Sequence, residues 1–336
     1  MPDKHILIKD APSIAGLAFR HFRGESDFPQ MVSVIHFSSL ADNEERHDTI
    51  ESLAKNYSSM TNCDPARDML MVEYFDELIG YGRVWWWDEG ENQRMYGMNA
   101  FLVPAMRRRG IGRTMQAWME WRIRQIAKTH PARLQKYFHS NATQHQAGKI
   151  ALLERLGYKP VRYFYEMVRP NLEQIPSLPL PAGLELRPVT PEHYRAIWKS
   201  ADEASRDEWG YSPATEEAYQ EWLSSPHFQP QLWQVAWDVA GGEVAGHVLT
   251  FIDEEQNRQL ERKRGYTEGV GVIRAWRGKG LAKALVARSL QAQKEAGMNE
   301  SALAADSNSQ SNVTKFYEGM GFRVVKRDTI YRKLLK

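Results

Sequence analysis

The chain repeats its own pattern at an interval of about 165 residues, and this repeat constrains the fold more than any other feature. Three separate sequence elements each occur twice, in the same order and with nearly the same spacing. The pairs are Glu77 with Glu243, Arg109 with Arg277 and Gly157 with Gly321. The sequence therefore predicts a tandem duplication, in which each copy forms one domain.

Residues 170–183, PNLEQIPSLPLPAG, separate the two copies. This stretch carries prolines at positions 170, 176, 179 and 181, and proline both lacks an N–H and restricts the residue before it. The pattern is typical of an extended linker. We therefore expect an N-terminal domain at 1–169 and a C-terminal domain at 184–336.

Each copy shows the same order of helix and strand patterns. A helical segment comes first, followed by two strands on either side of a short turn, predicted at Asp76-Glu77 and at Gly241-Gly242. A third strand, a basic glycine turn and a helix come next, and Gly297 is expected to end the second of these helices. A further strand, a short helix and a terminal strand close each copy. This order predicts an α/β fold with a mixed sheet.

Composition excludes several classes of protein. The formal net charge is +2, so the surface as a whole does not favour a nucleic acid partner. No apolar run approaches the roughly 18 residues of a membrane span, and the first residues are too polar for a secretory signal. The only cysteine, Cys63, cannot form an internal disulfide. We expect a cytoplasmic protein with no membrane partner, and the sequence leaves its oligomeric state open.

The glycine turns can bind an anion for a physical reason. The first N–H groups of a helix lack partners within the helix, and the helix dipole adds partial positive charge there. Arg277 and Lys279 add side-chain charge. Two familiar phosphate motifs are excluded, since Gly280 follows Lys279 where a Walker motif needs Ser or Thr, and Met115 and Lys283 replace the third glycine of a dinucleotide motif. The alternative is a structural turn whose basic residues face water.

At these turns the sequence resembles the GNAT superfamily of acyl-CoA-dependent N-acetyltransferases. The family motif is (Q/R)xxGx(G/A), and Arg107-x-x-Gly110-x-Gly112 matches it in full. We align the second copy as Ala275-x-x-Gly278-x-Gly280, which departs at the first position. The family's later element, Asn…(L/F)Y-x-x-x-GF, is matched by Asn312, Phe316, Tyr317, Gly321 and Phe322. The resemblance implies two tandem GNAT folds.

The resemblance also implies which residues bind acetyl-CoA, since in this family the turn amides hold its pyrophosphate and the thioester lies along the preceding strand. In the second copy these residues are Val270, Val272, Ile273, Arg277, Gly278, Lys279, Gly280, Leu281, Ala282, Asn308, Asn312 and Phe316. In the first copy they are Leu102, Val103, Arg108, Arg109, Gly110, Ile111, Gly112 and Arg113. No metal is expected.

The two copies differ where chemistry is expected. The resemblance implies that Tyr317 protonates the departing thiolate, whereas the first copy has Leu153 at this place and a leucine cannot donate a proton. Packing in the core is the alternative role for Tyr317. We expect the second copy to be the catalyst and the first to be degenerate, although its glycine turn is intact.

The base is sought near the strand before the turn, where the amine must approach. Glu268 lies there, and the spacing that pairs Arg109 with Arg277 gives Ala100 as its counterpart in the first copy. Glu254, Glu255 and His247 are alternatives, and a charged strand end facing water is another reading of Glu268. The acidic and aromatic stretch 202–211 is a candidate contact for a cationic amine or, equally, a charged helix end.

The leading hypothesis is an acetyl-CoA-dependent N-acetyltransferase that acts on a small-molecule primary amine, with Tyr317 as acid and Glu268 as base. A non-catalytic acyl-CoA-binding or ligand-binding protein is the first alternative. A tRNA-dependent aminoacyl transferase is the second, with Arg107, Arg108 and Arg109 as the RNA contact, but the net charge does not support it.

Overall fold

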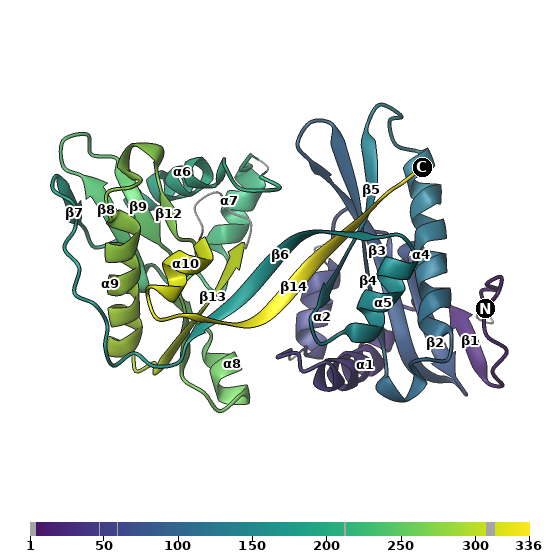
Figure 1. Ribbon diagram of the computed structural model, residues 1–336. Coiled ribbons are helices and arrows are strands. Elements are labelled where there is room, and N and C mark those ends of the chain that lie inside the picture. Colours follow the sequence, from purple (N-terminus) through teal and green to yellow (C-terminus); the bar gives the residue numbers. More distant parts are fainter. Residues whose placement is uncertain (1–4, 47, 59, 212, 307–312) are drawn as a thin grey trace. The chain divides into compact units, whose positions relative to one another are not determined.

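The computed structural model describes residues 5–46, 48–58, 60–211, 213–306 and 313–336. The chain forms two compact units (Figure 1). The N-terminal unit comprises the residues up to Arg162 together with Asp328–Lys336, and the C-terminal unit comprises Tyr163–Arg327. Each unit has its own hydrophobic core, as a tandem duplication predicts.

The strands of the N-terminal unit follow the order β1-β2-β3-β4-β5-β14 within a mixed sheet. Neighbouring strands are antiparallel except β4 and β5, which are parallel. The strands are β1 (Leu17–Arg20), β2 (Met69–Tyr74), β3 (Glu77–Glu89), β4 (Gln93–Leu102), β5 (Gln135–Thr143) and β14 (Arg323–Leu334). The helices are α1 (Phe28–Ala41), α2 (Ile50–Ser58), α3 (Pro65–Asp68), α4 (Ile111–Lys128) and α5 (Ala147–Arg155).

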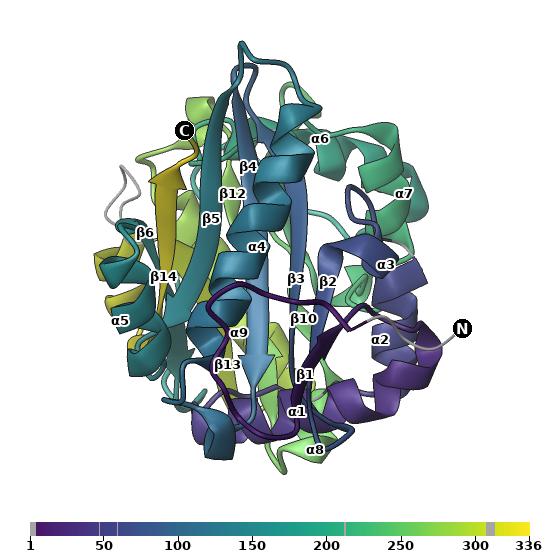
Figure 2. The ribbon, with the colours of Figure 1, turned by 90° about the vertical axis from the view of Figure 1, so that its right-hand side faces the viewer.

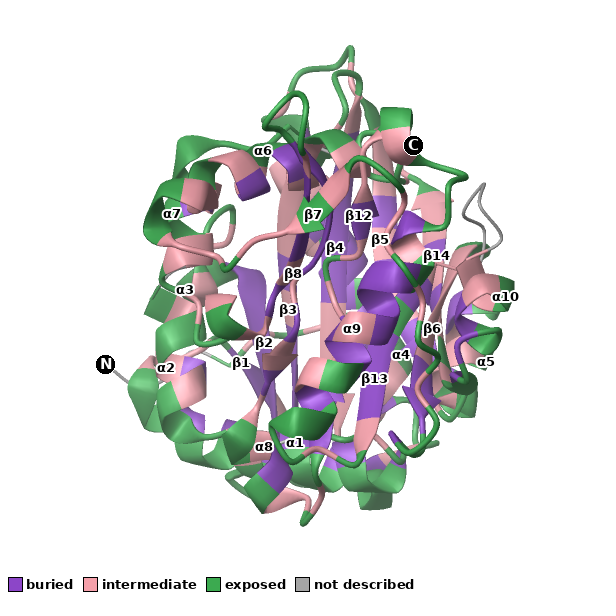
Figure 3. Ribbon diagram, turned by 90° about the vertical axis from the view of Figure 1, so that its left-hand side faces the viewer, coloured by how far each residue is buried: buried purple, intermediate pink, exposed green. Residues whose placement is uncertain are grey.

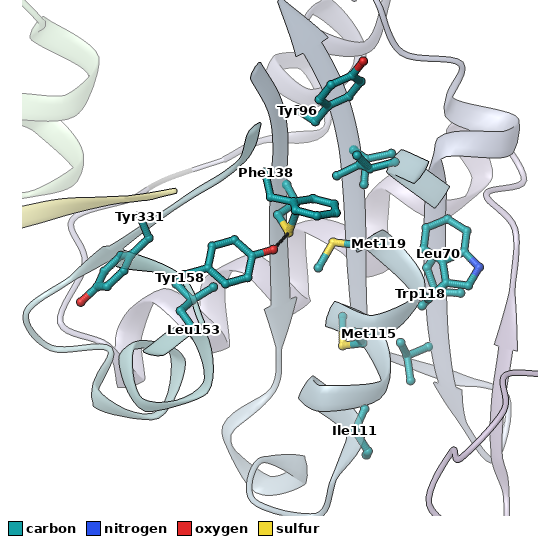
Figure 4. Packing of buried hydrophobic residues seen from close by; sticks show 14 of the residues in the cluster. Leu70, Tyr96, Ile111, Met115, Trp118, Met119, Phe138, Leu153, Tyr158 and Tyr331 are labelled. Atoms are coloured by element: carbon teal, nitrogen blue, oxygen red, sulfur yellow. Dashed lines mark hydrogen bonds between the residues drawn. The ribbon is translucent and has the colours of Figure 1, made fainter. Parts of the chain in front are cut away.

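Two hydrophobic clusters hold this unit together. The larger, called the α4 cluster below, joins α4 and α5 to the sheet and includes Met115, Phe138 and Tyr331 (Figure 4). The smaller joins α1 and α2 to the sheet through residues such as Met31 and Tyr81. In the described part of the chain no helix is long and apolar enough to cross a membrane.

The C-terminal unit has two sheets, ordered β6-β13-β11-β10 and β12-β9-β8-β7. The strands are β6 (Lys159–Arg169), β7 (Leu184–Leu186), β8 (Gln234–Asp238), β9 (Val244–Val248), β10 (Phe251–Ile252), β11 (Arg264–Tyr266), β12 (Gly271–Val272) and β13 (Glu300–Asp306). The helices are α6 (Tyr194–Ser205), α7 (Glu216–Leu223), α8 (Glu254–Gln259), α9 (Leu281–Glu295) and α10 (Val313–Glu318). Helix α9 has a buried face and an exposed face (Figure 3), and its buried residues pack with β8, β9 and β13.

The two predicted hairpins are present. The first turns at Phe75 and Asp76, both at positive φ, earlier than predicted, because Tyr74 pairs directly with Glu77. The second turns through Gly241 and Gly242. The predicted helix stop is also present, since Gly297 follows α9 with a φ of 85°.

The predicted third strand is continuous in the N-terminal unit but broken in the C-terminal unit. There it forms β11, which pairs with β13, and β12, which pairs with β9. The residues between them, 267–270, lie outside any strand. This break separates the two sheets of the unit.

The terminal strands of the two copies are exchanged. Residues 164–169 of β6 pair with β13 in the C-terminal unit. Residues 328–334 of β14 pair with β5 in the N-terminal unit, and the two strands lie side by side in Figure 2. The compact units therefore differ from the sequence ranges 1–169 and 184–336 in their last strands. Local patterns predicted these strands but carry no information on which sheet they join.

The proline-rich stretch 170–183 contains no helix or strand, as expected of an extended linker, but it is bound along the C-terminal unit. Leu172 is buried in the core of that unit, and Ile175, Leu178 and Leu180 pack against the same core. Arg288 of α9 donates a hydrogen bond to the Leu178 carbonyl at 2.7 Å. The stretch is thus a fixed part of the C-terminal unit.

The strand exchange predicts that a residue near the C-terminus stabilises the N-terminal unit. Tyr331 is buried in the α4 cluster, so Tyr331→Ala is expected to cost about 3 kcal/mol of unfolding free energy. Amide hydrogen exchange should then speed up in β5 and leave β13 protected. Val324→Ala, in an exposed part of the same strand, is the control and should change neither. Faster amide exchange confined to β13 would contradict the strand pairing described above.

Candidate active site

The candidate site of the C-terminal unit begins where two parallel strands diverge. The ladder between β11 and β13 ends at Tyr266 and Ala302, followed by one more hydrogen bond from Thr267 N to the Ala302 oxygen at 2.9 Å. The chain then turns away at Gly269, which has a φ of 55°, and joins the other sheet as β12. Beyond this point the facing strand edges no longer pair with each other.

Glu268 lies at the point of divergence. Its carboxylate Oε1 accepts a hydrogen bond from the Ala304 N–H of β13 at 3.0 Å, so the side chain reaches across the gap. Burial raises the pKa of Glu268 to about 7, although the Ala304 hydrogen bond acts in the opposite direction. This carboxylate therefore exchanges a proton near neutral pH.

The strand after Glu268 leads to the glycine turn. Val272 pairs with Gly246, and the Ile273 N–H donates to the Ala245 carbonyl at 3.1 Å, so both residues are held by β9. The Val270 N–H, which lies in the divergent part, donates to no protein acceptor within the described residues. It is available to a carbonyl oxygen placed in the gap.

The turn itself has the properties of an anion site. Gly278 and Gly280 have φ angles of 74° and 86°, and a Cβ on either would meet no atom within 4 Å. Gly280 precedes α9, and no side chain caps this helix. The N–H groups of Leu281 and Ala282 begin the helix, while the Leu281 side chain is buried beneath them.

Arg277 fixes the shape of the turn. Its guanidinium donates to the Val272 carbonyl at 3.0 Å, to Asp207 at 2.7 Å and to the Ala204 carbonyl at 3.2 Å. Hydrogen bonds from Arg274 and Arg277 lower the pKa of Asp207 to about 2, so this carboxylate stays charged. Arg277 is thus bound to the protein through its side chain.

Lys279 supplies an exposed positive charge at the turn. Its Nζ lies 4.5 Å from the centre of the Trp276 ring, so the ammonium group stays close to the loop. The space over Gly278 and Gly280 is open beside it. An anion at the start of α9 can therefore contact this side chain as well as the helix N–H groups.

The N-terminal unit repeats this arrangement and corrects the predicted alignment of the copies. Arg107 donates to the Leu102 carbonyl at 3.1 Å and to Asp42 at 2.6 Å, as Arg277 does to Val272 and Asp207. Gly110 and Gly280 both precede a helix, with φ angles of 88° and 86°. The predicted pairing of Arg109 with Arg277 was therefore wrong, because Arg107 is the residue that matches Arg277 in its contacts.

The corrected register, which pairs Arg107 with Arg277 and Gly110 with Gly280, changes the motif of the second copy. The matching residues are Arg277-x-x-Gly280-x-Ala282, which fulfil (Q/R)xxGx(G/A) in full, in place of Ala275-x-x-Gly278-x-Gly280.

The same register changes two further counterparts. Arg108 stands at the place of Gly278 and has a φ of 65°. The counterpart of Glu268 is Met98 instead of Ala100, and Met98 is a buried residue that cannot accept a proton. The N-terminal unit thus has no carboxylate at the place of Glu268.

Tyr317 lies on α10 with its ring buried. It makes edge contacts with Phe316 and Phe322, with ring centres 4.9 and 5.8 Å apart. Burial raises the pKa of Tyr317, and the negative charges of Glu268 and Glu208 raise it further. The phenol therefore stays protonated at neutral pH.

Leu153 is the counterpart of Tyr317. The Leu153 carbonyl accepts a hydrogen bond from Tyr158 N at 3.0 Å, and the Tyr317 carbonyl accepts one from Phe322 N at 3.0 Å. These matching hydrogen bonds agree with the predicted alignment of the two copies, in which Gly157 pairs with Gly321. Leu153 packs in the α4 cluster (Figure 4), and this position in the N-terminal unit carries no acid.

The alternative bases lie in less suitable surroundings. His247 is buried beside Ser200, with 3.3 Å between its Nδ1 and the serine Oγ, and burial lowers its pKa to about 4. Glu254 and Glu255 are exposed at the start of α8, and hydrogen bonds from Arg258 lower the pKa of Glu255.

The acidic residues of the stretch 202–211 have three different roles. Asp202 accepts hydrogen bonds from Tyr211 and Ala214, which is a structural role. Asp207 accepts a hydrogen bond from Arg277 and so holds the glycine turn, and the charge of Glu208 raises the pKa of Tyr317. The role of Asp207 was missed, although an acidic residue shortly after the first helix of each copy, Asp42 and Asp207, is a signal that the sequence contains.

The N-terminal turn is partly covered. A Cβ on Gly110 would lie 3.5 Å from Pro12, because the N-terminal segment passes over the start of α4. Leu102 and Val103 lead into this turn, and the Val103 N–H donates to Ile79. Arg108, Arg109 and Arg113 are exposed, Ile111 is buried and Gly112 is half-buried.

Two predicted coenzyme contacts, Asn308 and Asn312, lie outside the described residues. Within the described ranges, no group of three or more His, Cys, Asp or Glu residues has the arrangement of a metal site.

Comparisons with known proteins agree with this geometry. The sequence profile of the acetyltransferase (GNAT) family matches residues 34–158 and 194–322. Mycothiol acetyltransferase of Salinispora arenicola is 27% identical over 252 residues, covering 73% of this chain and 74% of that protein. The mycothiol acetyltransferase of Salinispora tropica is 28% identical over 233 residues, covering 67% and 69%.

Solved structures show the same fold. A GCN5-related N-acetyltransferase from Sphaerobacter thermophilus aligns with a TM-score of 0.75 at 24% identity, over 96% of both chains. A tandem GNAT protein from the clavulanic acid biosynthesis pathway aligns with a TM-score of 0.64 at 16% identity, over 95% of this chain and 98% of that one. With the family profile matching once in each copy, the chain belongs to the acetyltransferase (GNAT) family and is an N-acetyltransferase with two GNAT domains in tandem.

Proposed function

We propose that the C-terminal unit transfers an acetyl group from acetyl-CoA to the primary amine of a small molecule. The observation that carries the proposal is that the Glu268 carboxylate bridges the divergence of β11 and β13 just before the glycine turn, and that its charge raises the pKa of the Tyr317 phenol. The mycothiol acetyltransferases that this chain resembles support a small-molecule acceptor.

The turn and the divergent strand fit the donor. The N–H groups at the start of α9 and the exposed Lys279 would hold the pyrophosphate, and the open space at Gly278 and Gly280 admits it. An extended arm with amide groups can then run along the unpaired strand edge. The Val270 N–H would donate to the thioester carbonyl and stabilise negative charge on its oxygen as the amine attacks.

Glu268 and Tyr317 would move the protons. Glu268 accepts the proton of the ammonium, the amine forms the new C–N bond, and the C–S bond breaks. Tyr317 protonates the departing thiolate, whose conjugate thiol has an ordinary pKa near 8.5, and the resulting tyrosinate takes up the second proton, which the amine nitrogen releases as it becomes an amide.

The two groups are coupled. While Glu268 is charged, it raises the pKa of Tyr317. Once Glu268 has taken the proton of the amine, this charge is gone, and the pKa of the phenol falls. Tyr317 becomes a stronger acid at the stage when the thiolate leaves.

Replacement of the glycine at the helix start should weaken coenzyme binding. Gly280→Ala strains a left-handed residue at the turn and is expected to raise the Kd for acetyl-CoA about tenfold, equivalent to about 1.4 kcal/mol. Gly297→Ala is a matched control, because Gly297 has a φ of 85° and equally open surroundings at the other end of α9. Equal affinities of the two variants in a fluorescence or calorimetric titration would count against the proposed cradle.

Substitution of the proposed acid and substitution of the proposed base should have different effects on the kinetics. Tyr317→Phe is expected to lower kcat about a hundredfold in a thiol-release assay over a panel of amines, with little change in the Kd for acetyl-CoA.

In the wild type, kcat/KM should fall as the pH drops below about 7, because Glu268 must be charged to act as base. Glu268→Gln should lower kcat/KM and remove this acidic limb.

Full turnover in Tyr317→Phe would exclude it as the required acid. Coenzyme binding without thiol release for any amine would favour a non-catalytic acyl-CoA-binding protein.

Glu268 should also reduce stability at high pH. Its pKa of about 7 in the folded chain lies above the ordinary value near 4.5, so the folded state binds the proton more tightly. The free energy of unfolding therefore falls as the pH rises from about 4.5 to 7. Glu268→Gln should raise the Tm relative to the wild type at pH 8 and by much less at pH 5. An equal shift at both pH values would show that the carboxylate is not buried as a charge.

A further inference from the structure

The N-terminal unit has the same strand divergence as the C-terminal unit. The parallel ladder between β4 and β5 ends at Gly97 and His139, although β4 continues to Leu102 and β5 to Thr143. Past this point the two strands leave a gap in the place where the C-terminal unit would take the acyl arm. The contents of the two gaps differ.

Asn99 occupies the N-terminal gap. Its Oδ1 accepts a hydrogen bond from the Ala100 N–H at 3.0 Å. In the register that pairs Gly110 with Gly280, Ala100 corresponds to Val270, whose N–H is free of protein acceptors in the described structure. Asn99 corresponds to Gly269, which has no side chain. The N-terminal copy therefore satisfies within itself the donor that the C-terminal copy leaves for a ligand.

Lys149 spans the same gap from the other side. It lies in the first turn of α5, and its Nζ donates to Asn99 Oδ1 at 3.3 Å, which joins α5 to β4. Lys149 is half-buried, and burial lowers its pKa to about 8, while Asp42, Glu44 and Asp328 act to raise it.

The C-terminal copy has no equivalent of this lysine. In the register that pairs Leu153 with Tyr317, the counterpart of Lys149 is Val313, at the start of α10. The apolar side chain of a valine cannot donate a hydrogen bond across the gap. Asn99 and Lys149 are therefore replaced in the C-terminal copy by Gly269 and Val313, whose side chains cannot hydrogen-bond across the gap, and the side chain that reaches across it there is that of Glu268, the proposed base.

Further contacts bind the end of β5 to the loop after α1. The Thr143 hydroxyl donates a hydrogen bond to the Glu44 carboxylate. The side-chain amide of Gln146 donates to Asp42 at 3.3 Å, and its oxygen accepts a hydrogen bond from the Thr143 N–H. These contacts join the elements on both sides of the gap. An arm lying between β4 and β5 would have to break the Lys149 bond and compete with Asn99 for the Ala100 N–H.

From this contrast we infer that Asn99 and Lys149 close the acyl-arm slot of the N-terminal copy, so that the chain binds one acyl-CoA, in the C-terminal unit. The inference rests on the proposed function, because it takes the divergent strands as the place of the acyl arm. It gives Asn99 and Lys149 a role in determining which copy binds the donor. The N-terminal copy then lacks an open slot for the acyl arm as well as the acid and the base.

The test replaces the closing residues by their counterparts in the other copy. Isothermal titration of the full chain with acetyl-CoA, without an amine, should give one site in the wild type. The variant Asn99→Gly/Lys149→Val should give two sites, because the slot is opened and the Ala100 N–H released. Lys149→Val alone keeps the Asn99 contact and should give a second site at least tenfold weaker than in the double variant. Circular dichroism checks that each variant is folded.

Each other outcome overturns the inference. Two sites in the wild type would show that the N-terminal slot is open. One site in a folded double variant would show that Asn99 and Lys149 are not what closes it. Absence of any binding by the wild type would overturn the proposed function and this inference with it, and is thus distinguishable from the first two results.

Discussion

The site depends on two parallel strands that stop pairing before they end. Once β11 and β13 diverge beyond Tyr266 and Ala302, the backbone groups on their facing edges lose their ladder partners. In a protein interior such groups must find another partner, and a ligand with amide groups can supply one. Glu268 lies at this divergence, and its partial burial between the strand ends raises its pKa. A feature of backbone pairing thus creates both the proposed slot for the acyl arm and the surroundings of the proposed base.

The two copies show how a duplicated fold divides its roles. Both keep the arginine that fixes the turn and the glycine that precedes the helix, since the loop needs them to keep its shape in either copy. The residues that we propose to meet the substrate have changed, with Met98 and Leu153 at the places of Glu268 and Tyr317. The N-terminal copy also contributes structure, because its sheet receives the last strand of the chain.

Sequence patterns were sufficient for the tandem repeat, the hairpins and the glycine turns, because these features depend on local periodicity and on residues with special backbone angles. The match of Leu153 with Tyr317 followed from neighbouring glycines at positive φ. The predicted alignment of the two glycine turns was wrong because an Arg-Gly pair occurs both at Arg109 and at Arg277. Residue types alone do not show that Gly110 has the same backbone conformation as Gly280. Backbone angles resolve the ambiguity.

Long-range pairing could not be predicted in the same way. The last strand of each copy has an ordinary strand pattern, and nothing local shows that β6 pairs with β13 and β14 with β5. The bonds between Asp207 and Arg277 and between Lys149 and Asn99 likewise join residues far apart in the sequence. The perturbed pKa of Glu268 also follows from burial, which a sequence pattern does not specify.

The central claim is that the chemistry takes place in the gap beyond Tyr266 and Ala302. A crystal structure of the full chain with bound acetyl-CoA tests it most directly. The account predicts that the thioester carbonyl accepts a hydrogen bond from the Val270 N–H, with the sulfur beside the Tyr317 hydroxyl and the pyrophosphate at the start of α9. A thioester bound between β4 and β5, or one placed away from both Glu268 and Tyr317, would contradict it.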